Sequence, residues 1–96
     1  MTKTPRETVE SWLRYLAKGL YTADDVAMVI EDQIAVSGDL TLFQLAPPEV
    51  LGAMREHVAL FRQHGKWELS AGGPPVDHTE MMRKFSESMQ TAGLLD

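Results

Sequence analysis

Apolar residues recur at helical spacing in four stretches of this chain, and residues that start or stop helices bound each stretch. The first stretch has the most complete set of residues that start and stop a helix. Thr4 and Glu7 have the T-x-x-E spacing of a capping box, and Pro5 suits the first helical position. Gly19 is placed to end the helix in a left-handed conformation. The apolar stripe between these signals comprises Val9, Trp12, Leu13, Leu16, Ala17 and Leu20.

A second helix is expected from Thr22 to about Ser37-Gly38. Thr22 is a good N-cap, and Asp24 and Asp25 suit the positive end of the helix dipole. At about 100° per residue, one side of this helix gathers the residues expected to face the core. They are Val26, Val29, Ile30 and Ile34, with Gln33 among them.

A third helix is predicted to begin at Pro47-Pro48, with Glu49 in its first turn, and to stop at Gly65. Its expected core residues are Val50, Leu51, Met54, Val58 and Phe61.

The fourth helix is predicted to begin at Asp77, which forms a second capping-box pattern with Glu80, and to end at Gly93. Val76 and Met81 stand at the two positions of a hydrophobic staple. The apolar residues expected to face inward are Met81, Met82, Phe85, Met89 and Ala92.

Two further segments, DLTLFQL (39–45) and KWELS (66–70), are rich in strand-forming residues and are expected to be extended. Two strands alone make a marginal sheet, so we expect these segments to cover a helical core. With 96 residues and 44% hydrophobic content, the chain is expected to be one mainly α domain over residues 1–96. The expected architecture is an irregular four-helix bundle, with one or two short extended segments flanking the third helix.

Charge is distributed unevenly along the sequence. Residues 1–18 carry a net charge of +2, residues 55–96 a net of −1, and residues 19–54 a net of −6 with no Lys, Arg or His. Nucleic-acid binding uses Lys and Arg to displace counterions, so the acidic middle third disfavours it. The same region favours a basic protein partner, whereas an ordinary solubilising role is the alternative.

Residue patterns for catalysis or metal binding are missing from the sequence. There is no cysteine, and His57 and His64 are seven residues apart, whereas helical metal ligands need a spacing of three or four. No serine has a G-x-S-x-G context. Gly72-Gly73 resembles a phosphate cradle, but Pro74 and Pro75 supply no N–H donors. We therefore expect no enzyme activity, no cofactor and no metal.

The second helix offers the best candidate for a binding surface. With Asp24 at zero on a helical wheel, Met28 lies at about 40°, far from a core stripe centred near 210°. Carboxylates surround this methionine. An acidic rim around an apolar centre is typical of protein interfaces. The predicted partner-binding residues are Asp24, Asp25, Met28, Glu31 and Asp32, with Trp67 and the loop to Pro75 as a second contact region.

The leading functional hypothesis is a small acidic, non-catalytic protein that occludes a basic surface on a protein partner. Immunity proteins and antitoxins are examples of this physical type of inhibitor. The alternative is a structural adaptor or homodimerising subunit. A weaker third hypothesis is a small-ligand pocket walled by Trp12, Tyr15 and Tyr21. No apolar run is long enough for a membrane span, and the N-terminus has no secretory signal, so we expect a cytoplasmic protein.

Overall fold

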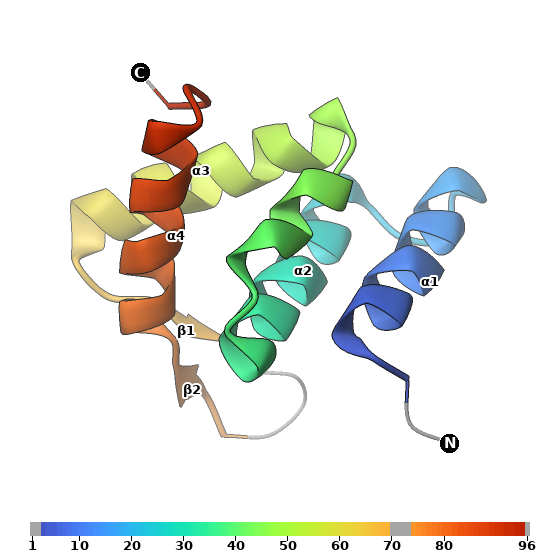
Figure 1. Ribbon diagram of the computed structural model, residues 1–96, viewed down its shortest axis with the longest axis horizontal. Helices are drawn as coiled ribbons and strands as arrows, with labels where there is room; N and C mark the ends of the chain where they lie inside the picture. The colour runs from blue at the N-terminus through green and yellow to red at the C-terminus, as the bar shows by residue number, and fades with distance from the viewer. Residues whose placement is uncertain (1–2, 70–73, 96) are drawn as a thin grey trace. The chain divides into compact units, whose positions relative to one another are not determined.

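The computed structural model describes residues 3–69 and 74–95, and these form a mainly helical chain (Figure 1). The fold class predicted from the sequence, mainly α with about four helices, is confirmed. The elements in chain order are α1 (Pro5–Ala17), α2 (Ala23–Ser37), the 3-10 helix η1 (Leu40–Leu45), α3 (Pro48–His64), β1 (Glu68–Leu69), β2 (Val76–Asp77) and α4 (Thr79–Thr91).

Contacts within the chain divide it into two units, Met1–Met54 and Arg55–Asp96, and α3 passes through the boundary between them. The first unit holds α1, α2, η1 and the first turns of α3. The second holds the rest of α3, the strand pair and α4. That residues 1–96 act as one domain stays a prediction.

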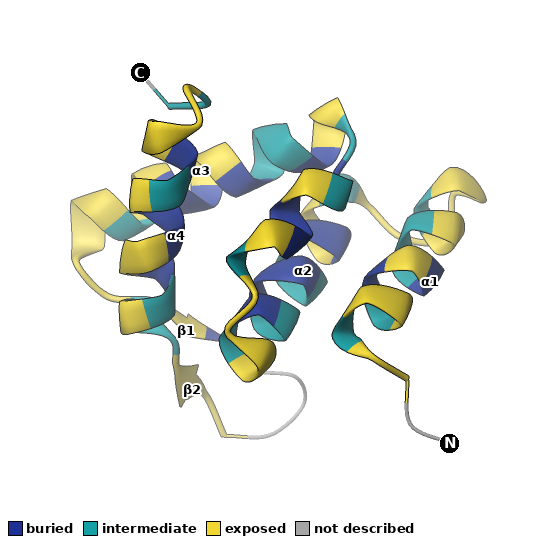
Figure 2. Cartoon of the chain, in the orientation of Figure 1, coloured by how far each residue is buried: buried dark blue, intermediate teal, exposed yellow. Residues whose placement is uncertain are grey.

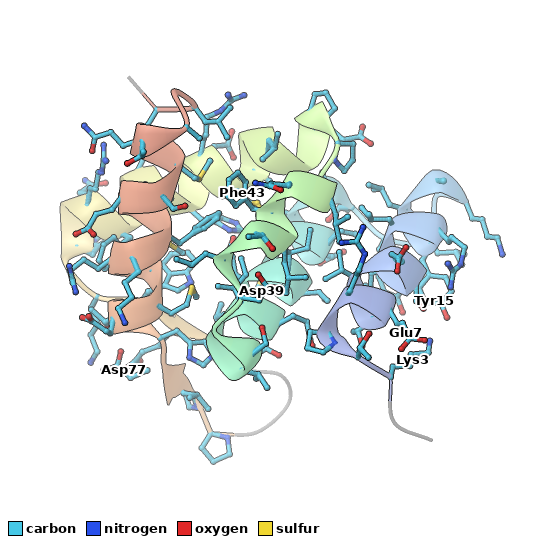
Figure 3. The ribbon with its side chains drawn as sticks, in the orientation of Figure 1. Lys3, Glu7, Tyr15, Asp39, Phe43 and Asp77 are labelled. Atoms are coloured by element: carbon cyan, nitrogen blue, oxygen red, sulfur yellow. The ribbon has the colours of Figure 1, made fainter. Side chains whose placement is uncertain are left out.

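Helix α1 begins as its sequence pattern predicts. The Thr4 Oγ1 accepts a hydrogen bond from the Glu7 N–H, and the Glu7 carboxylate accepts one from the Thr4 N–H, each at 3.1 Å. The bond from the Thr4 N–H is the main reason that the pKa of Glu7 is lowered from its ordinary value. Figure 3 shows Glu7 at the first turn of α1, beside Lys3. The helix ends before Gly19, whose φ of 75° is the left-handed conformation expected there.

In the first unit, α1 packs against α2, and both contact η1. Figure 2 shows the buried positions of α2 as an almost continuous stripe along the helix. The buried apolar residues of these elements are Val9, Val26, Ala27, Ile30, Ile34, Leu42 and Phe43.

Residues 40–45 form a 3-10 helix, so the prediction of an extended segment there is wrong. The side chain of Asp39 accepts a hydrogen bond from the Thr41 N–H at 3.0 Å, which favours a turn over a strand. Leu42 and Phe43 are neighbours in sequence and both are buried. A strand would direct them to opposite faces, whereas a helical turn lets both contribute to the core.

The extended segment predicted at 66–70 is confirmed at Glu68–Leu69, while Ser70 lies outside the described residues. Strand β1 pairs with β2 in antiparallel register, with Glu68 opposite Asp77 and Leu69 opposite Val76. The partner of this strand is therefore the segment before α4. Residues 41–45, the other segment predicted to be extended, do not take part in the pair.

The predicted start of α4 at Asp77 is wrong, because this residue belongs to β2 (Figure 3). The helix begins at Thr79 after His78, which makes no capping bond with its side chain. The Asp77 carboxylate instead accepts a hydrogen bond from the Thr79 N–H at 2.9 Å. Glu80 pairs with Arg83 rather than with a capping partner, and Val76 is 56% exposed in the strand. Strand pairing thus holds the chain extended for longer than the local pattern indicates.

Candidate functional site

The N-terminus of α2 is built by a reciprocal pair of hydrogen bonds. Thr22 Oγ1 accepts from the Asp25 N–H, and the Asp25 carboxylate accepts from the Thr22 N–H, each at 3.1 Å. Asp24 and Asp25 are both exposed, as predicted, and lie in the first turn, where the helix dipole favours negative charge. Asp25 therefore contributes to the helix start as well as to the surface charge.

The buried side of α2 is rotated from the side that its apolar pattern predicts. The buried residues centre at about 270° on the wheel that puts Asp24 at zero, which is roughly 60° from the predicted centre. Ala27 is buried, whereas Val29, expected at the core, is only half-buried. The helix packs against both α1 and η1, so these two neighbours determine which side of α2 is buried.

This rotation places Glu31 in the interior, where its side chain has an exposure of 0%. The prediction that Glu31 lies on the exposed acidic face is therefore wrong. A buried carboxylate is costly to remove from water and makes no direct contact with a partner at the surface. Glu31 acts within the fold, and the acidic surface of α2 has one carboxylate fewer than the sequence suggested.

The surface that remains on this helix combines carboxylates with apolar side chains. Met28 and Asp32 are half-buried, and Val36 is 73% exposed, more than any other large hydrophobic residue described. We call this surface the α2 outer face, and it comprises Asp24, Asp25, Met28, Val29, Asp32 and Val36.

Sequence reasoning missed Val29 and Val36 as members of this face. Val36 lies at about 120° on the wheel, between the directions of Asp32 and Val29. A helical wheel centred on the charged residues would have found it. Val29 could not have been found in this way, because its place depends on the rotation of the helix.

Two basic side chains, Lys3 just before α1 and Arg14 within it, meet at a buried hydroxyl. Lys3 Nζ donates to Ser11 Oγ at 2.8 Å, and Arg14 Nη2 donates to the same oxygen at 3.0 Å. Ser11 itself is buried. These contacts anchor two of the basic residues of the first unit on α1, while the charged residues of α2 are all acidic and η1 has none.

Trp67, the other predicted contact residue, belongs to the second unit and is half-buried. Its ring lies against that of His57, with centroids 5.3 Å apart. The backbone N–H of Trp67 donates to Thr79 Oγ1 at 3.1 Å, and its backbone carbonyl accepts from the His78 N–H at 2.8 Å. No described residue accepts a hydrogen bond from its buried Nε1. Trp67 thus joins β1 to the start of α4, and residues 70–73 of the predicted contact loop lie outside the described residues.

Trp12, Tyr15 and Tyr21 pack on one another instead of standing apart as pocket walls. Their ring centroids are separated by 4.4 Å for Trp12 and Tyr21, 6.0 Å for the two tyrosines, and 6.1 Å for Trp12 and Tyr15. Both tyrosines are exposed, as is the neighbouring Leu20 at 64%. The three rings form a surface cluster, with Tyr15 visible on α1 in Figure 3.

Within residues 3–69 and 74–95, no group of three or more His, Asp or Glu side chains is close enough to hold a metal ion. None of the helices described is both long and apolar enough to cross a membrane.

The geometry defines a small, mainly helical chain whose clearest candidate interface is the α2 outer face. Comparison with known proteins shows no match to a family model, a curated protein sequence or a solved structure.

Proposed function

We propose that this chain is a non-catalytic, cytoplasmic protein that binds a protein partner through the α2 outer face and occludes a basic surface on it. Inhibitors of the immunity-protein or antitoxin type act in this way. The observation that carries the proposal is the composition of that face. Exposed carboxylates lie beside half-buried Met28 and exposed Val36 on one helix, and residues 19–54 contain no basic side chain.

Each part of the face has a separate task in this proposal. Asp24, Asp25 and Asp32 attract a basic partner and orient it during encounter, an effect that falls with added salt. Val36 and Met28 supply apolar area that is removed from water in the complex. Loss of a carboxylate should therefore slow association, and loss of apolar area should speed dissociation.

The test begins with capture of partners from the native host on the immobilised chain, followed by kinetic measurements on the partner found. Asp24→Lys should slow association and reduce its dependence on salt, and Val36→Ser should speed dissociation. Glu10→Lys is the matched control, because Glu10 is an exposed carboxylate on α1. Equal effects of Asp24→Lys and Glu10→Lys would show that only net charge matters. Unchanged kinetics with both α2 variants would exclude the α2 outer face as the interface.

A second candidate function, a homodimerising or adaptor subunit, is favoured by the aromatic cluster of Trp12, Tyr15 and Tyr21. Tyr15, Leu20 and Tyr21 are exposed, and the rings of the two tyrosines lie 6.0 Å apart. Association through such a surface would be almost independent of salt, unlike association through the α2 outer face. Tyr21→Ser would weaken this association and leave binding through α2 unchanged.

A further inference from the structure

The second unit contains an open surface cavity of about 510 Å³, well separated in sequence from the α2 outer face. Its volume lies within the range of small-molecule sites. The lining comes from α3 and from the chain after α4, and consists of Arg55, Val58, Ala59, Arg62, Leu94 and Leu95.

One face of α3 supplies the floor and both ends of this cavity. Arg55 and Arg62 are seven residues apart, with Val58 and Ala59 between them at helical spacings of three and four. Two turns of helix separate the arginine Cα atoms by about 10.5 Å along the axis. A cation thus stands at each end of a short apolar floor.

The chain just after α4 supplies the rest of the lining. Gly93 has a φ of 76°, and the Leu94 N–H donates to the Met89 carbonyl at 2.9 Å. This bond turns the chain back at the helix end. Leu94 and Leu95 are consequently half-buried, and they add aliphatic surface to the cavity.

The positive charge of the two arginines is not neutralised by any described acidic group. Arg62 donates from Nε to Ser86 Oγ at 3.2 Å and from Nη2 to Gln90 Oε1 at 3.3 Å, and both acceptors are uncharged. These bonds hold its guanidinium in place. Arg55 is exposed, and no described residue forms a hydrogen bond or ion pair with its side chain. The cavity therefore combines one cation held by hydrogen bonds and one exposed cation with aliphatic lining residues.

We propose that this cavity binds an aliphatic carboxylate, a hydrocarbon chain that ends in one carboxyl group. The carboxylate pairs with a guanidinium, which suits the planar geometry of both groups. The hydrocarbon chain covers Ala59, Leu94 and Leu95, which still have exposed surface. The cavity lining has no aromatic ring on which a nucleobase or another flat ligand could stack, so an aliphatic ligand fits better.

Octanoate, at concentrations below micelle formation, is the probe for this site. Titration followed by NMR should shift the signals of Ala59 and Leu94, and calorimetry should give the affinity. Octanol has the same chain without the charge, and octylammonium has the opposite charge. We expect both to bind at least about tenfold more weakly than octanoate, because they lose the charge-assisted hydrogen bonds.

Arg55→Gln tests the charge without disturbing a described contact, and we expect it to weaken octanoate binding at least about threefold. Arg55→Glu should weaken it further. Arg6→Gln is the matched control, because Arg6 is an exposed arginine of the first unit that does not line the cavity. Arg62→Gln needs a melting curve beside the binding measurement, because Arg62 also bonds Ser86 and Gln90. The melting curve separates a loss of stability from a loss of octanoate binding.

Equal binding of octanoate and octanol would overturn the proposal, as would equal losses with Arg55→Gln and Arg6→Gln. Octanoate shifts confined to the rings of Trp12, Tyr15 and Tyr21 would also overturn it, because the ligand would then occupy the aromatic cluster. None of these results bears on the α2 outer face, so the proposed function and this site fail independently.

Discussion

Arg62 on α3 donates a hydrogen bond to the hydroxyl of Ser86 on α4, across 24 residues of sequence and a distance of 3.2 Å. Ser86 is buried, and the apolar residues Met82, Phe85 and Met89 of the same helix are buried beside it. The bond therefore joins the two helices of the second unit at the edge of its apolar surface.

Ser86→Ala should lower the free energy of unfolding by about 1 kcal/mol, because it removes an acceptor from a charged donor. Chemical denaturation followed by circular dichroism measures this change. Ser88→Ala is the control, since Ser88 is half-buried on the same helix and its hydroxyl has no described hydrogen bond. An effect of the same size in both variants would mean that the Arg62 contact adds nothing to stability.

Phe85→Ala should cost about 3–5 kcal/mol, because the Phe85 side chain is fully buried and its removal leaves a cavity. Trp12→Ala and Phe61→Ala should cost less, since both side chains are only half-buried. Denaturant titrations of the three variants give the order of their losses in unfolding free energy. A loss with Trp12→Ala larger than that with Phe85→Ala would contradict the burial pattern described.

Glu31→Lys should strongly destabilise the fold, by about 3–5 kcal/mol, because it places an ammonium group at a fully buried carboxylate position. Asp24→Lys, at an exposed position on the same helix, should change stability by less than about 1 kcal/mol. Thermal melts of the two variants separate these outcomes. Similar melting temperatures would mean that Glu31 is accessible and belongs to the surface after all.

The pKa of Asp77 is lowered from its ordinary value, first by the hydrogen bond from the Thr79 hydroxyl and then by that from the Thr79 N–H. A lowered pKa in the folded state means that this carboxylate stabilises the fold above its unfolded pKa of 3.8 and stops doing so as the pH falls through the folded value. Thr79→Val removes the first hydrogen bond. We expect the Asp77 pKa, followed by NMR titration, to rise toward 3.8 in this variant.

Thr4→Ala should have a smaller effect of the same kind at the start of α1, because it removes the Thr4 hydroxyl but keeps the Thr4 N–H, whose hydrogen bond lowers the Glu7 pKa most. Loss of this cap should also destabilise the chain by about 1 kcal/mol. The Glu7 pKa should move up toward 4.5, and the Asp77 pKa should stay unchanged as an internal control. A Glu7 pKa that does not move would show that the Thr4 hydroxyl contributes nothing to the ionisation of this group.

Local chemistry determined where most helices begin and end. The capping boxes at Thr4 and Thr22 act over three residues, so they could be recognised without knowing the rest of the fold. Gly19, Gly38, Gly65 and Gly93 all adopt positive φ at or just beyond the ends of α-helices, as their spacing in the sequence indicated. For the candidate site, the same local reasoning correctly placed Asp24 and Asp25 on the exposed first turn of α2.

Tertiary structure decided the features that depend on contacts between distant residues. The pairing of Leu69 with Val76 holds Asp77 in a strand and moves the start of α4 to Thr79. Packing of α2 against both α1 and η1 rotates its buried side, which places Glu31 inside and leaves Val29 partly outside. The apolar pattern shows that a helix has a buried side, but neighbouring elements determine how wide that side is and where its edge falls. A residue near that edge can be assigned to core or surface only when those neighbours are known.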